Sequence, residues 1–485
     1  MGKGLVRRFG CNRVLVLAAI GAVAASAFAM GTAAAASGPA GPHMSPNLTA
    51  VRGPAVSTLA LDATHKACLF SPPYTCYGPY DMAKVYNFPA HLDGRGQTII
   101  IVDAYGSPTL MADLATFDHY FGVPAPRSFT VINVPGTGVT GSGALTSWQV
   151  ETSLDVEYAH AMAPGANIVL AVAATDNNFD LNAAEAKVLP LYPGAIVSQS
   201  FGDWETDATA GTSFAEQHKI LQAATRLGDT ILASAGDAGA TWTQYTNTTS
   251  PALASYPASD PLVTSVGGTQ GNPYPAGLEV AGAYGGEAAW NEPAFGAATG
   301  GAPSVLFSAP SWQRGDTGYK TRTIPDVAYS AAINGGLEVV ASPFIYLVGG
   351  TSCGSPQWAA IFALANQARA SVGHGSLGFA NATLYKLAEQ QNRSGQGSQH
   401  DDKSSVTDFH DITTGNNALF STIGFSAGPG YDLATGWGTP NVANLIRDLV
   451  GPSSDRNPEA SDPASIHGSS STAGPHAPDT MAPGL

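Results

Sequence analysis

The sequence predicts an α/β protein built on one doubly wound, mostly parallel sheet with helices on both faces. Short segments rich in β-branched residues are continuously apolar, which is typical of parallel strands buried on both faces. Longer amphipathic segments alternate with them along the chain. This alternation is the pattern of βαβ units, in which a helix returns the chain across one face of the sheet.

The predicted strands and helices can be assigned to definite residue ranges. Buried parallel strands are expected at Thr98–Val102, Ile168–Ala173, Ala195–Ser200, Thr230–Ala233 and Phe344–Val348. Helices are expected at Thr109–Tyr120, Ser147–Ala161, Thr212–Leu227 and Ser352–Ala370. One doubly wound sheet accounts for all of these segments.

The composition indicates a large folded core and excludes one class of partner. Charged residues are 12% of the 485 residues and hydrophobic residues are 44%, whereas charged residues are about 25% of an average soluble protein. The net charge is −15, from 21 basic and 36 acidic residues. A chain with this charge repels the phosphate backbone, so we expect no nucleic-acid partner.

The first residues have the pattern of a secretory signal peptide, which we place at residues 1–36. Four basic residues precede an apolar run from Val14 to Met30, and small residues follow up to Ala36. A membrane anchor is the alternative, but the run is short for a span of about 20 residues. We therefore expect a secreted, extracellular protein with no stable membrane association after cleavage, and a monomer.

The rest of the chain divides into three parts. Residues 37–76 lack periodicity and are rich in Ala, Pro, Ser and Gly, as in a linker or a short pro-segment. Residues 77–450 carry the βαβ pattern and form one domain. Residues 451–485 contain almost no large apolar residue, which predicts a disordered tail.

Three cysteines remain once the signal peptide is removed. Cys68 and Cys76 lie eight residues apart in a proline-rich segment, and in an oxidising exterior this spacing predicts a local disulfide. Cys353 is then unpaired, and we interpret it as a packing residue.

A serine stands where the last predicted strand meets the last predicted helix. Ser352 lies in the string Gly-Gly-Thr-Ser-Cys-Gly-Ser-Pro at residues 349–356. At this turn the serine is at the positive end of the helix dipole, where its own N–H can face a developing oxyanion. The position therefore suits a nucleophile, although a serine that only caps the helix has the same pattern.

A serine nucleophile needs a base, and two carboxyl groups are candidates. Glu151 and Asp155 are four residues apart on a predicted helix, so they share one face. Like charges at this spacing are mildly destabilising, which suggests a use. If they are partly buried, they share a proton, so that one acts as base and the other orients it. A solvated acidic face that includes Glu157 is the alternative.

A third candidate follows another predicted strand, in the string Ser-Ala-Gly-Asp that ends at Asp237. A carboxylate repels an oxyanion, but a protonated carboxyl group can donate a hydrogen bond to it. Asp237 can therefore serve an oxyanion hole only while it is neutral.

These motifs together resemble the sedolisins, secreted serine-carboxyl peptidases with a subtilisin-like fold and a Ser-Glu-Asp triad. The strings that carry the resemblance are Glu151-x-x-x-Asp155, Ser-Ala-Gly-Asp237 and Gly-Thr-Ser352 with Pro356, supported by Val-Ser-Gln-Ser200-Phe-Gly202. The resemblance implies that Ser352 is the nucleophile, Glu151 the general base and Asp155 its orienting partner. It also implies that Asp237 is the oxyanion-hole donor, that the backbone at Ser200 and Gly202 binds an extended substrate, and that Asp103 joins the acidic network.

The resemblance further implies one structural Ca²⁺ near the C-terminus. The side chains of Asp411 and Asp432 and the carbonyl groups of Ile412, Gly428 and Gly430 would be its ligands. Carboxylate and carbonyl oxygens suit this hard cation, which takes six or more of them. The spacing does not match an EF-hand, and a turn-rich loop without metal is the alternative.

The activity implied is that of an acid-active secreted endopeptidase, which cleaves protein or peptide substrates through an acyl-enzyme. Ordinary Glu and Asp side chains titrate at about 4.3 and 3.9, so a carboxylate base and a neutral Asp237 coexist best at about pH 3–5.

Two other functions fit parts of the sequence. A catalytically silent, calcium-stabilised binding module is favoured by the shortness of the pro-segment, because sedolisins usually carry a long folded one. A histidine-dependent subtilisin-like hydrolase is disfavoured, because the sequence has no His-Gly-Thr-His segment.

Overall fold

The computed structural model describes residues 42–58, 68–71, 74–138, 141–207, 210–241, 252–271, 284–315, 317–394, 407–420 and 423–451. The expected signal peptide and, apart from Gly451, the expected tail lie outside these residues. Within them, no helix is both long enough and apolar enough to cross a membrane.

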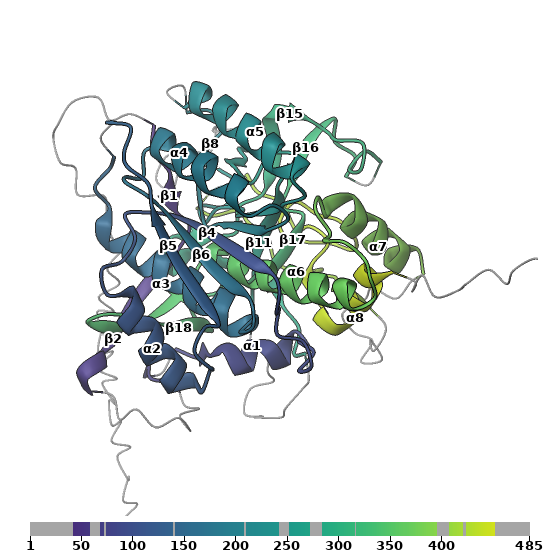
Figure 1. The fold of residues 1–485 in the computed structure, drawn as a ribbon. Helices are drawn as coiled ribbons and strands as arrows, with labels where there is room; N and C mark the ends of the chain where they lie inside the picture. The colour runs from purple at the N-terminus through teal and green to yellow at the C-terminus, as the bar shows by residue number, and fades with distance from the viewer. Residues whose placement is uncertain are drawn as a thin grey trace, which may run out of the picture.

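The main sheet is doubly wound, as predicted. In the described chain it has eight strands, and β4 lies between β6 and β7, parallel to both (Figure 1). Strand β5 continues the sheet beyond β6, and β9, β11 and β17 continue it beyond β7, while β12 adds an antiparallel edge. The bounds are β4 (Thr98–Ala104), β5 (Ser128–Asn133), β6 (Asn167–Ala173), β7 (Ile196–Gln199), β9 (Thr230–Ser234), β11 (Thr264–Gln270), β12 (Ala288–Ala289) and β17 (Val327–Ser330).

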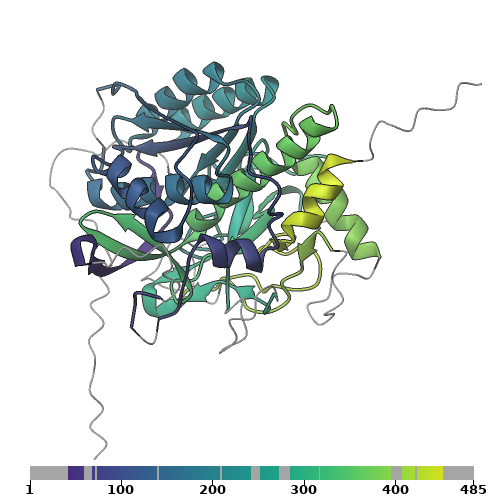
Figure 2. The same cartoon turned by 60° about the horizontal axis from the view of Figure 1, so that its bottom comes forward.

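Helices cover both faces of this sheet. One face carries α4 and α5, and the other carries α2, α3 and α6, with α1, α7 and α8 packed around them (Figures 1 and 2). The bounds are α1 (Pro79–Val85), α2 (Leu110–Phe121), α3 (Leu145–Met162), α4 (Asn178–Val188), α5 (Gly211–Arg226), α6 (Gly354–Ser371), α7 (Asn381–Arg393) and α8 (Val442–Val450).

Strand β4 shows why its sequence is continuously apolar. Ile99 and Ile101 belong to the core beneath α3 and α6, whereas Ile100 and Val102 belong to the core beneath α4 and α5. Successive side chains of a strand point to opposite faces, so a strand covered on both faces needs an apolar residue at every position.

One predicted strand is wrongly placed. The segment predicted at Phe344–Val348 forms β19 (Phe344–Gly349), which lies outside the parallel sheet and pairs antiparallel with β18 (Gly336–Ala341) and with β2 (Thr49–Ala55). Only two residues connect β18 to β19, and a connection this short joins antiparallel strands, since parallel ones need a long crossover. In Figure 2, β2 lies beside this hairpin.

The described part of segment 37–76 pairs with the domain at three places. Strand β1 (Ser45–Pro46) pairs with β8 (Phe201–Trp204), β2 pairs with β19, and β3 (Cys76–Tyr77) pairs with β18. The remaining short elements are η1 (Val56–Thr58), η2 (Leu189–Leu191), β10 (Ser255–Tyr256), β13 (Asn291–Glu292), η3 (Pro293–Phe295), β14 (Ala297–Ala298), β15 (Ala302–Ser308), β16 (Thr321–Ile324), η4 (Thr351–Cys353), β20 (Phe409–His410) and β21 (Thr439–Pro440).

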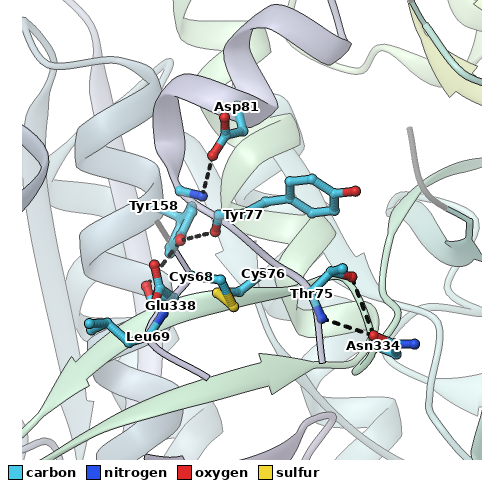
Figure 3. The surroundings of a disulfide bond; sticks show 10 residues. Cys68, Leu69, Thr75, Cys76, Tyr77, Asp81, Tyr158, Asn334 and Glu338 are labelled. Carbon is cyan, nitrogen blue, oxygen red and sulfur yellow. Dashed lines mark hydrogen bonds between the residues drawn. A yellow bond between two sulfur atoms is a disulfide. The ribbon is translucent and has the colours of Figure 1, made fainter. Parts of the chain in front are cut away.

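A disulfide joins Cys68 to Cys76 just before α1 (Figure 3). Beside it, the backbone N–H of Leu69 donates to the Glu338 carboxyl group at 2.9 Å. The Tyr158 hydroxyl, which comes from α3, donates to the Glu338 carbonyl oxygen at 3.0 Å. The first contact connects the residues between the two cysteines to β18, and the second connects α3 to the same strand. Cys353 is a buried free thiol.

Several carboxyl groups are buried in the fold. Glu185 on α4 is fully buried and accepts a hydrogen bond of 2.8 Å from the Gln217 amide on α5. Burial raises its pKa to about 8, although the bond from Gln217 lowers it. The folded protein therefore binds a proton at Glu185 over a pH range in which the unfolded chain does not.

We predict that the melting temperature falls as the pH rises from 5 to 8. A carboxyl group with a raised folded-state pKa contributes stability that is complete below its unfolded pKa and is lost as the pH rises through the folded value. The contribution is a few kcal/mol, since a tenfold change in proton affinity is worth about 1.4 kcal/mol. Glu185→Gln should flatten this dependence in calorimetry, and Glu216→Gln, an exposed neighbour on α5, should not. Parallel curves for Glu185→Gln and wild type would contradict the assignment.

Candidate active site

The candidate residues meet at the carboxyl ends of the parallel strands. The chain runs outward from β4 in both directions across the sheet, and in doubly wound folds ligands bind at this reversal point. Asp103 is the second-last residue of β4, Ser200 directly follows β7, and Ser234 ends β9. Because parallel strands share one direction, these side chains lie at the same edge.

Ser352 lies in the turn η4 that leads directly into α6 and is fully buried. Its hydroxyl donates to the Ser200 carbonyl oxygen at 3.2 Å. The N-cap position of α6 belongs to Cys353, and no side chain caps it. The structure therefore contradicts the capping alternative and leaves the Ser352 hydroxyl at the strand ends.

Glu151 and Asp155 lie on α3 and are both fully buried. Glu157 is buried as well and accepts a hydrogen bond from the Val340 N–H at 3.1 Å, so the alternative of a solvated acidic face is wrong. Asp155 accepts a hydrogen bond of 2.8 Å from the Ser200 hydroxyl. Within the described residues, neither oxygen of Glu151 has a hydrogen-bond partner of ordinary geometry.

The electrostatics of this cluster favour shared protons. Burial raises the pKa of Glu151 well above its ordinary value, repulsion from Asp155 and Asp103 adds to this, and the nearby Ser352 hydroxyl lowers it. Burial and repulsion from Asp103 likewise raise the pKa of Asp155. Burial also raises the pKa of Asp103 to about 7. Because ionisation of all three neighbouring carboxyl groups in a buried site is unfavourable, at least one of them keeps its proton.

Asp237 presents one free oxygen beside Ser352. Its Oδ1 accepts hydrogen bonds of 2.8 Å from both the backbone N–H and the hydroxyl of Thr351. Its Oδ2 is buried and has no hydrogen-bond partner within the described residues. Burial raises the Asp237 pKa to about 8, although the bonds from Thr351 lower it. The side chain is therefore protonated at acid pH and can donate through Oδ2.

Thr351 is a residue whose role the sequence did not indicate. Its two hydrogen bonds to Oδ1 determine which oxygen of Asp237 is free, and its hydroxyl also accepts from the Gly236 N–H at 3.1 Å. Its position next to Ser352 was visible in the sequence, but a partner 114 residues away was not.

The residues of the expected calcium site surround one turn. Gly430 N–H donates to Asp411 at 3.0 Å, and Gly428 N–H donates to Asp432 at 3.1 Å. Burial raises the pKa of Asp411 to about 6, and repulsion from Asp432 adds to it. Two carboxyl groups close enough to repel, with the Ile412 carbonyl nearby in sequence, form an oxygen-only donor set that fits a hard cation.

No family model matches the sequence, but known proteins are similar to it. Kumamolisin of Bacillus sp. (strain MN-32) is 34% identical over 394 residues, which are 79% of this chain and 65% of kumamolisin. Sedolisin of Pseudomonas sp. (strain 101) is 27% identical over 383 residues, which are 76% of this chain and 60% of sedolisin. The chain belongs to the sedolisin family.

A solved structure supports the fold assignment. Pseudomonas sedolisin, a serine-carboxyl proteinase solved with two molecules of pseudo-iodotyrostatin, superimposes with a TM-score of 0.65 at 27% identity. The match covers 77% of this chain and 98% of that one. The predicted subtilisin-like fold is confirmed. The chain spans less than two thirds of the length of the curated sedolisin relatives named above.

Proposed function

We propose that this protein is a secreted, acid-active serine-type endopeptidase that uses Ser352, Glu151 and Asp155 as a triad. One observation carries the proposal: a buried serine at a helix start lies beside a buried carboxyl pair and a protonatable carboxyl group, one oxygen of which has no hydrogen-bond partner among the residues that the structure describes. Membership of the sedolisin family supports the same activity, with proteins or peptides as substrates.

Each residue of the site has its own role in the proposed reaction. Ser352 Oγ attacks the carbonyl carbon of the scissile bond and passes its proton to Glu151, while Asp155, held by Ser200, orients Glu151. The negative charge on the carbonyl oxygen is met by the Ser352 N–H and by the proton on Asp237. Glu151 then gives its proton to the leaving amine, and water hydrolyses the remaining ester.

Two ionisation conditions set the pH range of activity. Glu151 must be able to accept a proton, and Asp237 must hold one. In this structure burial raises the Asp237 pKa to about 8. Because burial is the main cause, entry of water with substrate lowers the pKa of both groups towards ordinary values and moves the active range to acid pH.

We predict that Ser352→Ala and Glu151→Gln each lower kcat by at least about a thousand-fold, since each removes a member of a unit that acts together. The assay is cleavage of a denatured protein across pH 3–8. Glu157→Gln is the matched control on the same helix, equally buried, and it should retain activity. Substantial activity in Glu151→Gln would remove Glu151 from the triad. An inert wild type would favour a silent binding module.

We also predict that Asp237→Asn keeps most of its activity at acid pH and retains it to higher pH than wild type. Asparagine preserves the acceptor for Thr351 and offers an amide donor that does not ionise. Asp237→Ala lacks both and should lose about 10²–10³-fold in kcat. The measurement is a pH profile of kcat/KM. Equal losses in the two variants would contradict a donor role.

We propose that one structural Ca²⁺ binds Asp411, Asp432 and the carbonyl groups of Ile412, Gly428 and Gly430. A metal that binds only the folded state raises its stability. Adding Ca²⁺ after chelation should raise the melting temperature by at least about 2 °C. Asp411→Asn should abolish this response. A melting temperature that does not depend on Ca²⁺ would exclude the site.

A further inference from the structure

The backbone of Asn47 has the contacts that a substrate residue just before the cut bond would make. The Ser352 N–H donates to the Asn47 carbonyl oxygen at 3.2 Å, and the Asn47 N–H donates to the Ser200 carbonyl oxygen at 3.2 Å. Before Asn47, β1 pairs antiparallel with β8, as an added peptide strand does. In acyl transfer the N–H of the nucleophile faces the carbonyl oxygen of the attacked bond. The surroundings of the Asn47 side chain therefore show which side chain this position accepts.

The Asn47 side chain donates to Ser234, which ends β9. Its amide nitrogen lies 2.8 Å from the Ser234 hydroxyl oxygen and 3.5 Å from the Ser234 carbonyl oxygen. Ser234 is fully buried, and among the described residues the Asn47 amide is the one hydrogen-bond partner of its hydroxyl. A buried hydroxyl group that loses its partner is costly. Ser234 therefore favours a side chain that can form a hydrogen bond at this point.

Gly202 leaves the room that this amide needs. A Cβ atom added to Gly202 would collide with the Ser255 hydroxyl oxygen and would lie 3.4 Å from the Asn47 amide nitrogen. It would also lie 3.3 Å from the Tyr256 carbonyl oxygen. These groups are held together because β10, which contains Ser255 and Tyr256, pairs with β8. The space around the amide is thus small and is bordered by hydroxyl and carbonyl groups.

These surroundings provide no counter-ion. Among the described residues, no charged side chain forms a hydrogen bond with the side chains of Asn47, Ser234 or Ser255. A lysine or arginine side chain of a substrate would lose water here without gaining an opposite charge. A carboxylate would lose water as well and would add negative charge near the acidic cluster. The position therefore suits an uncharged polar side chain.

We propose that this protein cuts preferentially after asparagine, and that Ser234 is the residue that determines the preference. The inference rests on the proposed peptidase activity and specifies its substrate class. Leucine has nearly the shape of asparagine but no donor, so it would leave the Ser234 hydroxyl without a partner. Glutamine has the amide but one methylene group more than the small space beside Gly202 holds in this structure.

The same contact gives aspartic acid a distinctive behaviour as a substrate residue. Its side chain has the shape of asparagine, and when it is protonated its hydroxyl group can donate to Ser234. An ordinary Asp side chain loses that proton at about pH 3.9. The ratio of kcat/KM for asparagine to that for aspartic acid should therefore increase up to about tenfold per pH unit above about pH 4. A ratio that stays constant from pH 3 to 6 would contradict recognition by this hydrogen bond.

The main test compares matched peptides around a bond that wild type cuts. The residue before that bond is varied among asparagine, leucine, glutamine and aspartic acid, and kcat/KM is measured at pH 4. Wild type should prefer asparagine to leucine by at least about tenfold, since only asparagine partners the buried hydroxyl. Ser234→Ala should lower kcat/KM for asparagine by a similar factor and bring the two peptides close to equality.

Ser265→Ala is the matched control variant. Ser265 is a buried serine on β11, which pairs with β9, and its hydroxyl has no hydrogen-bond partner among the described residues. This variant should keep the wild-type preference. A preference that Ser234→Ala leaves unchanged would overturn the role of Ser234.

A second measurement needs no activity. In the full chain carried as Ser352→Ala, the melting temperatures of Asn47→Leu, Ser234→Ala and the double variant form a cycle. Because the two side chains are partners, the double variant should melt at least about 1 °C above the value that the sum of the single effects gives. Strictly additive effects would overturn recognition of the amide by Ser234.

The outcomes separate this inference from the proposed function. Wild type that cuts the asparagine and leucine peptides equally well overturns the inference and leaves the peptidase proposal standing. Wild type that cuts no peptide at any pH overturns the peptidase proposal and the preference that rests on it, while the melting cycle still decides whether Ser234 recognises the amide.

Discussion

Desolvation of carboxyl groups is the interaction on which the rest of this structure depends. Glu151, Asp155 and Asp103 come from a helix and a strand whose other residues form the core, so their side chains lose water when those elements pack. Ionisation of all three in this environment is unfavourable, and their pKa values rise. A carboxyl group in this state can exchange a proton with a hydroxyl, a task that an exposed carboxylate at neutral pH performs poorly.

The fold creates this environment by the order of its strands. Because the chain leaves β4 in both directions, the ends of β4, β7 and β9 border one space, and α3 and α6 cover it from one side. Ser352 is 201 residues from Glu151 in the chain, yet both belong to elements of the same helical layer. Packing of α3 against α6 therefore determines the relation between nucleophile and base.

The same desolvation connects the site to the segment that crosses it. The Ser352 N–H donates to the carbonyl oxygen of Asn47 at 3.2 Å, and burial is the leading cause of the raised pKa of both Glu151 and Asp237. A raised pKa at Glu151 opposes its action as a base, whereas a raised pKa at Asp237 favours its action as a hydrogen-bond donor. The low charge content of the chain is consistent with a protein whose interior carboxyl groups are neutral.

The sequence by itself determined four strands of the parallel sheet, β4, β6, β7 and β9, because burial on both faces requires continuous apolar runs such as β4. It did not indicate β5, β11 or β17. It also determined the family, because Glu151, Asp155, Asp237 and Ser352 stand in motifs whose order is informative. Only the tertiary structure decided where β19 pairs, since the hydrophobicity of a strand does not specify its partner. It alone decided that α3 is buried on every side from Val150 to His160, and that β1 and Asn47 lie against β8, Ser200 and Ser352. Backbone hydrogen bonds hold that segment, and they leave no periodic pattern of side chains in the sequence.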